Sequence, residues 1–339
     1  MNRSAAVDSP PMRLFLFLGK KREMALVAVL IALVLFTGSV RPAFLGMQTL
    51  KDVLLNVAIV SLLSAGMTGV MLMRHIDLSV SSTLGLSAYA VGALFVDHPH
   101  MPIVVAMAAG IAIGLVAGAI NAAMVVFGNV PSLVATLSTL YIYRGADYAW
   151  VHGGQVNASN LPAAFADLGT ASLLGMPVLV LIAGAVLVAF SIYLQQFPGG
   201  REHYAVGSNP EAARLAGIRV GRRVAIGFVT SGAIAGLAGV LWLARFGTVD
   251  ASTGTGLELQ VVAAAVVGSV AITGGAGTIL GATLGALILG VISISLVVLR
   301  VSPFWEQAIQ GLLIVLAIAS DAALARAIAR RLREQRRHG

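Results

Sequence analysis

Long apolar runs recur along this chain, and most of them are long enough to cross a lipid bilayer. Each crossing of a hydrocarbon core ~30 Å thick needs about 20 mostly apolar residues. A soluble protein of 339 residues would need far more charge on its surface than a chain that is 58% hydrophobic and 11% charged can supply. Because backbone polar groups in lipid must pair internally, the spans should be helices. We therefore expect an all-α polytopic membrane protein.

About ten such segments can be placed, and two of them are weaker than the rest. The segment at 130–150 is interrupted by polar residues, and the one at 257–273 is short and rich in small residues. Both are candidates for re-entrant or broken helices, which membranes tolerate where protein or water covers the backbone. The ten segments are 24–40, 53–73, 79–96, 103–127, 130–150, 174–194, 224–246, 257–273, 277–299 and 304–322.

Basic residues gather in three places, which sets the expected orientation. Sixteen of the 22 Lys and Arg residues lie in a leader at 1–23, a loop at 195–223 and a tail at 323–339. Because cytoplasmic loops carry the excess of Lys and Arg, we place all three in the cytoplasm, around a membrane domain at 24–322. The net charge of +8 then records topology, and no nucleic-acid partner is expected. The opposite loops would hold four aspartates, Asp97, Asp147, Asp167 and Asp250.

Two regions share a G-x-x-x-G-A core and suggest a loose internal repeat. Gly114–Val126 and Gly281–Ile292 each carry it, and each follows a segment opened by an acid, Asp77 in one and Glu258 in the other. Small side chains let membrane helices approach closely, so both regions are candidate packing seams. Ordinary glycine enrichment in membrane helices is the alternative.

Motifs of enzyme active sites are missing from the sequence. It contains no G-x-x-x-x-G-K-[ST] phosphate loop, no H-E-x-x-H and no G-x-S-x-G. It also has no cysteine, and its only close histidine pair, His98 and His100, reads as a solvated turn rather than a metal site. We expect a non-catalytic chain that binds no metal and no cofactor of its own.

The polar residues within the predicted spans are mostly hydroxyl and amide side chains rather than charged ones. A cation-coupled carrier usually places ionisable residues within its spans, and few are found here. The polar residues favour a lining for a neutral, hydroxyl-rich solute, whereas hydrogen bonds between helices are the alternative. The candidate lining residues are Asn56, Ser64, Asn121, Thr136 and Ser138.

The cytoplasmic loop contains the pattern of one short helix. Asn209 can cap it, Pro210 suits its first turn, Glu211 lies at its positive end, and Gly217 can end it. Two turns are marginal alone, so a partner surface should hold this helix. A solvated connecting helix is the alternative.

At this loop a family resemblance becomes visible and extends over nearly the whole chain. "GREHYAVGSNPEAARLAGIRV" resembles the cytoplasmic coupling segment of bacterial ABC-transporter permeases for monosaccharides of the ribose, xylose and rhamnose type. "RHIDLSVSSTLGLSA", "VPSLVATLSTLYIYRG" and "VSPFWEQAIQGLLIVLAI" resemble family segments in the same order. "TLYIYRG" and "ASTGTGLELQ" are most similar to the branch for rhamnose or autoinducer-2. Arg74 and His75 stand where the family usually has Gly-Gly or similar.

The resemblance implies a subunit of an importer in the bacterial inner membrane, with both termini cytoplasmic. Two permeases, identical or related, would form the pore in the lipid. A periplasmic sugar-binding protein would deliver the small-molecule solute, and cytoplasmic ABC ATPases, which hold the ATP and Mg, would supply the energy. The implied docking residues are Gly200, Arg201, Tyr204, Asn209, Pro210, Glu211, Ala212, Ala213, Arg214, Leu215 and Ala216.

Two other functions remain as alternatives. A branched-chain amino acid ABC permease has related helices, but its solute would call for charged groups along the pathway. An ion-coupled secondary carrier or a membrane enzyme would act without partner subunits and would need acids within the membrane.

Overall fold

The computed structural model describes residues 10–302, 304–316 and 319, and it is almost entirely helical. In this part of the chain, seven helical stretches are long and apolar enough to cross a membrane. The polytopic all-α fold is thereby confirmed. The stretches are Glu23–Val40 within α1 (Pro10–Val40), α2 (Met47–Met71), α3 (Val80–Asp97), α4 (Ile103–Val126), α7 (Val178–Gln196), α10 (Val220–Phe246) and α12 (Ile279–Val298).

The two segments expected to be weak differ from the other helices. α5 (Ser132–Val151) is one continuous helix of 20 residues, so it is not broken, but it is not apolar enough to count among the seven. α11 (Leu257–Val267) has 11 residues, and at 1.5 Å per residue it rises ~16 Å, about half the hydrocarbon core. The last helix, Phe304–Leu316, is also short within the described residues.

Two sequence-based placements differ from the structure, and a third lies outside the described residues. α1 begins at Pro10, so the helix starts inside the predicted leader rather than at residue 24. Asp147, expected in an external loop, lies within α5 and is fully buried, because that helix extends to Val151. The predicted tail at 323–339 lies outside the described residues, as do residues 317–318 and 320–322 of the last predicted segment.

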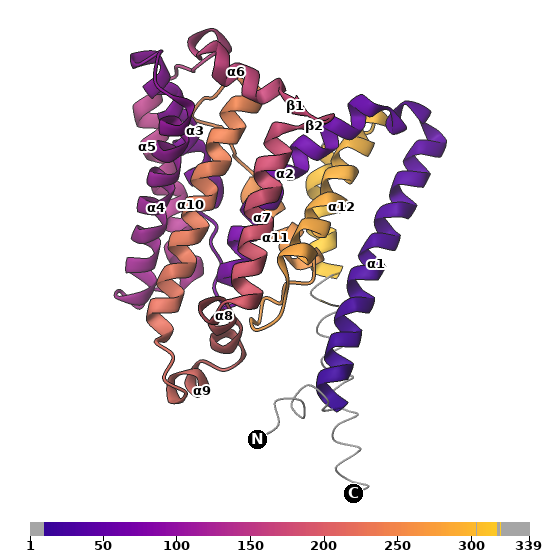
Figure 1. Ribbon diagram of the computed structural model, residues 1–339, viewed down its shortest axis with the longest axis vertical. Helices are drawn as coiled ribbons and strands as arrows, with labels where there is room; N and C mark the ends of the chain where they lie inside the picture. The colour runs from indigo at the N-terminus through magenta and orange to yellow at the C-terminus, as the bar shows by residue number, and fades with distance from the viewer. Residues whose placement is uncertain (1–9, 303, 317–318, 320–339) are drawn as a thin grey trace, which may run out of the picture.

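The connections place small elements at opposite ends of the molecule (Figure 1). α6 (Ala163–Thr170) and an antiparallel hairpin of β1 (Ser172–Leu173) and β2 (Met176–Pro177) lie at one end, which we call the α6 end. α8 (Pro198–Ser208) and α9 (Pro210–Leu215) lie at the other, the α9 end. Two short 3-10 helices complete the chain, η1 (Pro42–Leu45) and η2 (Ala158–Asn160).

The core is built around α2 and α10, and their contacts reveal the internal repeat. α10 packs on α3 and α4, whereas α2 packs on α11 and α12, and the two long helices also contact each other. α2, α3 and α4 therefore correspond in order to α10, α11 and α12, and each long helix packs against the two shorter helices of the other half. This exchange explains why α2 is buried along most of its length, from Val57 to Met71.

The two glycine seams are close contacts between helix backbones. A Cβ on Gly114 of α4 would lie 2.0 Å from the carbonyl oxygen of Gly232 in α10, and one on Gly285 of α12 would lie 2.0 Å from that of Ala264 in α11. Side chains larger than hydrogen cannot fit at either point. The predicted packing seams are thus confirmed in both halves.

Outward-facing surfaces of the helices are apolar. Val104 on α4, Leu35 on α1 and Val188 on α7 are each at least 60% exposed, as expected for side chains that face lipid. α1 stands at the edge of the bundle beside α12 (Figure 1). The buried Thr37 hydroxyl of α1 donates to that of Ser295 in α12, at 3.0 Å.

Candidate functional site

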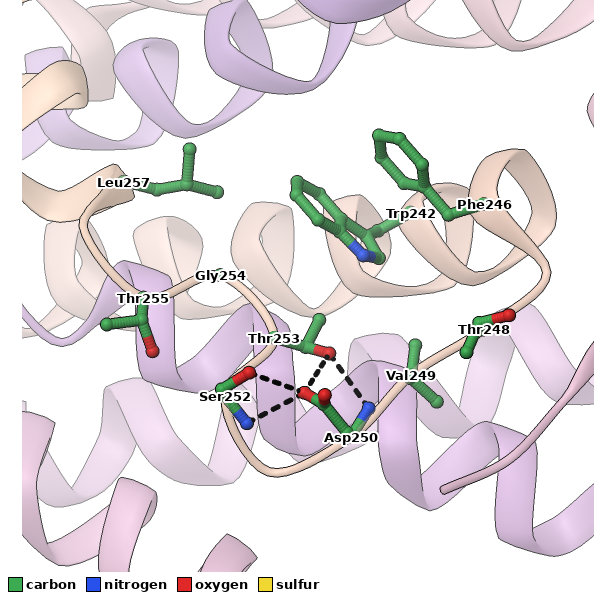
Figure 2. A pocket seen from close by; sticks show the side chains of 10 residues that line it. All are labelled: Trp242, Phe246, Thr248, Val249, Asp250, Ser252, Thr253, Gly254, Thr255 and Leu257. Atoms are coloured by element: carbon green, nitrogen blue, oxygen red, sulfur yellow. Dashed lines mark hydrogen bonds between the residues drawn. The ribbon is translucent and has the colours of Figure 1, made fainter. Parts of the chain in front are cut away.

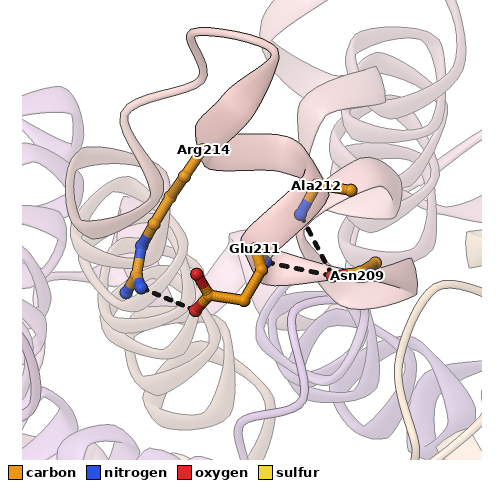
Figure 3. A network of polar contacts seen from close by, with 4 residues as sticks. All are labelled: Asn209, Glu211, Ala212 and Arg214. Atoms are coloured by element: carbon orange, nitrogen blue, oxygen red, sulfur yellow. Dashed lines mark hydrogen bonds and ion pairs between the residues drawn. The ribbon is translucent and has the colours of Figure 1, made fainter.

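The helix expected in the cytoplasmic loop is present as α9, with the predicted cap (Figure 3). The Asn209 Oδ1 accepts hydrogen bonds from the backbone N–H groups of Glu211, at 3.0 Å, and Ala212, at 3.1 Å. Pro210 occupies the first turn, where no backbone donor is needed. Gly217 ends the helix with φ +83°, a left-handed conformation that glycine adopts without strain.

α9 rests on the bundle through one side chain and projects the rest outward. Ala213 is buried against α10, whereas Leu215 is 92% exposed. Glu211 and Arg214 form an ion pair at 2.7 Å in which both side chains are exposed, and such pairs contribute little to stability. An almost fully exposed leucine on a short, doubly capped helix is a surface suited to a partner.

α8 holds α9 in place, and the sequence did not reveal it as a helix. Gly200 lets α8 pack directly on α7, because a Cβ there would lie 2.1 Å from the Tyr193 carbonyl oxygen. His203 is buried beneath it, and its Nδ1 donates to the Gly199 carbonyl at 3.0 Å. Burial lowers the pKa of His203, so the ring is neutral at pH 7. Arg201, also expected to shape this approach, has an exposed side chain.

The C-terminal end of α8 joins two other segments in one junction. The Arg74 Nε donates to the Gly207 carbonyl at 2.5 Å, and its guanidinium also donates to the Ser208 carbonyl at 2.7 Å. The Gly275 N–H, from the segment after α11, donates to the Leu72 carbonyl at 2.9 Å. A Cβ on Gly207 would lie 1.7 Å from the same Leu72 oxygen. The C-terminal end of α8 thus lies in direct contact with both segments.

Tyr204 makes a second connection from α8. Its hydroxyl donates to the Gly277 carbonyl at 3.1 Å. Burial raises the pKa of Tyr204 to about 12, so it stays a protonated donor at physiological pH. Of the residues expected to shape this approach, Gly200 and Tyr204 therefore have defined contacts, and Arg74 is a contact that sequence reasoning missed.

A buried polar network lies where the chain passes from α2 to α3. The Asp77 Oδ1 accepts from the Ser79 hydroxyl, at 2.6 Å, and from its backbone N–H, at 3.1 Å, while Oδ2 accepts from Ser231 of α10 at 3.0 Å. Asn121 of α4 donates to the Ser79 hydroxyl at 2.7 Å and accepts from Thr139 of α5 at 2.7 Å. This network ties three helices to the segment before α3.

The five candidate lining residues are distributed over different environments. Asn121 belongs to the buried network, and the Thr136 hydroxyl beside it donates to the Ser132 and Ile76 carbonyls. Ser64 is buried and contacts the Val261 carbonyl at 3.4 Å, whereas Ser138 is exposed on α5. The structure does not bring the five together, and their role as a lining stays a prediction.

Asn56, one of these five, lines a pocket. The pocket has a volume of about 230 Å³ and lies between α2, α10, α11, α12 and the last helix. Its other polar lining residues are Gln260, Ser293 and Glu306. The Ser293 hydroxyl donates to Glu306, which also accepts from Gln310 at 3.1 Å. A carboxylate thus lies inside the helical assembly at a point that sequence reasoning treated as a segment end.

A second pocket covers the connection between α10 and α11 (Figure 2). Its volume is about 380 Å³, and it shares Trp242 and Leu257 with the smaller pocket. Polar residues of the connection line one side of it and aromatic residues of α10 the other. The sequence signal was the polar run "TVDASTGTG" after Trp242 and Phe246, but only the fold shows that the two face each other.

The connection is fixed from beneath by a buried arginine. Arg144 of α5 is 8% exposed and donates to the carbonyls of Ala251, at 2.9 Å, and Thr253, at 2.6 Å. Asp147, one turn further along α5, is fully buried, and its carboxylate has no hydrogen-bond partner among the described residues. A backbone bridge between Val156 and Val249 holds the start of the connection.

Comparison with known proteins gives one family and a consistent set of relatives. The profile of the family described as "Branched-chain amino acid transport system / permease component" matches residues 49–318. The chain is 38% identical over 314 residues to the "Autoinducer 2 import system permease protein LsrC" of Klebsiella pneumoniae subsp. pneumoniae, covering 93% of this chain and 90% of the relative.

Two further relatives carry the same name. The protein of Enterobacter sp. (strain 638) is 37% identical over 314 residues, with 93% of this chain and 90% of the relative covered. That of Shigella flexneri is 36% identical over 321 residues, with 94% and 92% covered. No solved structure matches the chain.

Proposed function

We propose that this chain, which belongs to the family of transport permease components matched above, is the pore-forming subunit of an ATP-driven importer. Its solute would be autoinducer-2 or a similar neutral, hydroxyl-rich molecule. The observation that carries this proposal is the identity of 36–38% to autoinducer-2 import permeases over at least nine-tenths of both lengths. Rhamnose, which the sequence left equally open, has no such support.

The proposed partners follow from the two ends of the molecule. The α9 end, with its five neighbouring arginines, would face the cytoplasm, and the exposed Leu215 would enter a groove of an ABC ATPase. The α6 end would face a periplasmic binding protein that delivers solute. A second permease, identical or related, would complete the pore in the bacterial inner membrane.

The junction beneath α8 supports a route for the energy. A partner that moves α9 would move α8, because Asn209 joins the two helices directly. Arg74 would carry this displacement to the segment before α3, and the Leu72–Gly275 bond and Tyr204 to the segment after α11. The segment before α3 and the segment after α11 would then shift together, which is the coupled change that alternating access requires.

A branched-chain amino acid is the second candidate solute, because the family description names it. The two candidates separate by their charges. Leucine carries an ammonium and a carboxylate, whereas a hydroxyl-rich solute needs neutral donors and acceptors. The two pockets between α2, α10, α11 and α12 contain the carboxylates of Asp250 and Glu306, which could accept from an ammonium, but no Lys or Arg among their described lining residues could pair with a carboxylate. This lining favours the neutral solute over the amino acid.

The test is uptake by the reconstituted transporter. The chain, its neighbouring-gene ATPase, the second permease and the binding protein are placed in proteoliposomes with ATP inside. We expect uptake of labelled autoinducer-2 that needs the ATPase and the binding protein and that excess leucine does not reduce. Uptake by this chain alone would establish a secondary carrier, and strong competition by leucine would establish an amino acid permease.

The docking role of α9 has its own test in the same system. Replacing Pro210–Leu215 with a glycine-serine run should abolish ATP-driven uptake while the protein still inserts in the membrane, because the partner then has no rigid surface to hold. Leu215→Ala should weaken ATPase binding without altering the stability of the isolated chain, since the side chain touches little. Unchanged uptake after the replacement would refute the assignment.

A further inference from the structure

The pocket over the α10–α11 connection has the composition of a site for a sugar-like molecule. Its volume of about 380 Å³ falls within the about 300–1,000 Å³ of small-molecule sites. It lies near the C-terminal end of α10, toward the α6 end and away from α9 (Figure 1). A solute arriving on the side opposite the ATPase would therefore meet it early.

One wall of the pocket is aromatic. Trp242 and Phe246 project side by side from α10, with ring centroids 4.4 Å apart and planes inclined by 43° (Figure 2). The Arg245 guanidinium lies over the Phe246 ring, 4.6 Å from its centroid, and so fixes the position of that ring. The exposed faces of the rings suit the C–H surface of a small cyclic solute, and the indole N–H of Trp242 is a donor without a partner among the described residues.

The facing wall carries a carboxylate that is held in place on one side only. The Asp250 Oδ1 accepts from the Ser252 N–H and hydroxyl, both at 2.8 Å, and from the Thr253 hydroxyl at 3.3 Å (Figure 2). These hydrogen bonds, with Ser252 first, lower the pKa of Asp250, so it is ionised at neutral pH. Its Oδ2 accepts no hydrogen bond from the part of the chain that the structure describes.

The position of this free oxygen is set from below. Arg144 fixes the carbonyls of Ala251 and Thr253 on either side of Ser252, and the Val156–Val249 bridge fixes the residue before Asp250. A carboxylate that is already oriented loses little conformational freedom when it accepts a hydrogen bond from a solute hydroxyl. A hydrogen bond to a charged acceptor is also about twice as strong as one between neutral groups.

We propose that this pocket is the outer binding site of the permease, where a hydroxyl-rich solute stacks on Trp242 and its hydroxyls donate hydrogen bonds to Asp250. The proposal rests on the proposed import function and names the site where solute first binds. Trp242 and Leu257 also line the smaller pocket beside it, with Asn56, Gln260 and Glu306 beyond. A solute passing Trp242 therefore meets a second set of amide and carboxylate groups.

The test uses Asp250→Asn and Trp242→Leu in the reconstituted transporter. The first substitution keeps the size of the side chain, but the amide nitrogen that it introduces can replace the free acceptor by a donor. Matched controls are Asp97→Asn, an exposed acid at the end of α3, and Trp305→Leu, an exposed tryptophan. We expect about a tenfold loss of autoinducer-2 uptake in each pocket variant, the effect of one charged hydrogen bond or one stacked ring, and no loss in the controls.

A second readout separates solute binding from docking of the binding protein. The concentration of solute-loaded binding protein that half-maximally stimulates ATP hydrolysis should be unchanged in both pocket variants. A rise in that concentration would show that the pocket seats the protein rather than the solute and would overturn the proposal. Uptake unchanged in both variants would also overturn it. Neither result affects the import function, which fails only if the wild-type transporter takes up no autoinducer-2.

Discussion

The chain breaks its helical path at two corresponding places, and the two breaks are built in opposite ways. The first, residues 72–79, precedes α3, and the second, residues 247–256, precedes α11. In the first, Asp77 is 1% exposed and both its oxygens are hydrogen-bonded within the protein. In the second, Asp250 lines an open pocket, and one of its oxygens has no partner among the described residues.

The difference shows that corresponding breaks of the two repeats have different roles, one in packing and one in binding. The first break joins α4, α5 and α10 through a network whose polar groups are hydrogen-bonded to one another, so it fixes the packing of the first half against the second. The second break uses its polar groups only partly and keeps a carboxylate oxygen and an indole N–H for something outside the chain. We therefore expect the first break to govern stability and the second to govern binding.

Removing the acid of each break should expose this contrast most strongly. Asp77→Leu leaves the Ser79 and Ser231 hydroxyls without their acceptor in a buried site, so we expect a loss of about 3 kcal/mol or more. Asp250→Leu should change stability by about 0.5 kcal/mol or less, because water can reach the groups it leaves. The free energy of unfolding in detergent, measured with increasing SDS, checks both. Equal losses would abolish the distinction between the breaks.

The glycine seams should behave alike, in contrast to the breaks. Gly114→Ala and Gly285→Ala each place a Cβ 2.0 Å from a backbone oxygen that cannot move independently. Both should lose about 1–3 kcal/mol through forced separation of the helices. Gly184→Ala in α7 is the control, since a Cβ there meets nothing within 4 Å, and it should be neutral or stabilising by up to about 1 kcal/mol. A loss in only one seam would mean that the repeat is not symmetric in its packing.

The links from α8 to the two halves of the repeat should differ in strength. Arg74→Gln removes a charged donor to two carbonyls beside the first break, and we expect ATP-driven uptake to fall by about tenfold, within the about 0.5–2 kcal/mol typical of coupling networks. Tyr204→Phe removes one neutral hydrogen bond to Gly277 and should reduce uptake by about threefold. ATPase binding to α9 should persist in both, measured by co-purification. Loss of that binding would show that these residues hold α9 rather than transmit its movement.

Sequence reasoning found the features that depend on local pattern. The membrane helices follow from apolar length alone, and α9 follows from Asn209, Pro210 and Gly217, whose effects are confined to neighbouring residues. The weakness of α5 and α11 was also visible, because polar and small residues interrupt them. The seams were predicted from glycine spacing, although the sequence could not tell which helix each one would meet.

Features that depend on distant contacts were missed. α8 begins with Pro-Gly-Gly, which disfavours a helix locally, and it forms because Gly200 fits against α7 and His203 is buried. Arg74 was noted only as a departure from the family pattern, because its partners lie more than 130 positions away. Asp250 was placed in a loop on the side opposite the cytoplasm, and its second carboxylate oxygen becomes a candidate acceptor only because α10 places two aromatic rings opposite it.

Mild acid tests the contrast through two histidines alone. Burial lowers the pKa of His75 in the first break and of His203 in α8 below the ordinary value of 6.5, even though hydrogen bonds to the Gly199 and Gly200 carbonyls oppose the shift of His203. Between the folded and unfolded pKa values the unfolded chain binds more protons, so stability must fall as the pH drops below 6.5. Asp250 also has a lowered pKa, but its contribution is present above 3.8 and is lost only below it.

Acidification from about pH 7.5 to about pH 5.5 should therefore weaken the first break and the α9 end, with a slope of at most about 1.4 kcal/mol per pH unit for each histidine, while Asp250 keeps its charge and its hydrogen bonds. The unfolding free energy of the wild-type chain should decline over this range, and that of the double variant His75→Gln, His203→Gln should decline less. Asp250→Asn should follow the wild-type curve in parallel. A flat wild-type curve would mean that both rings take up protons as readily in the folded protein as in the unfolded chain, and the first break would then be less closed than its hydrogen bonds imply.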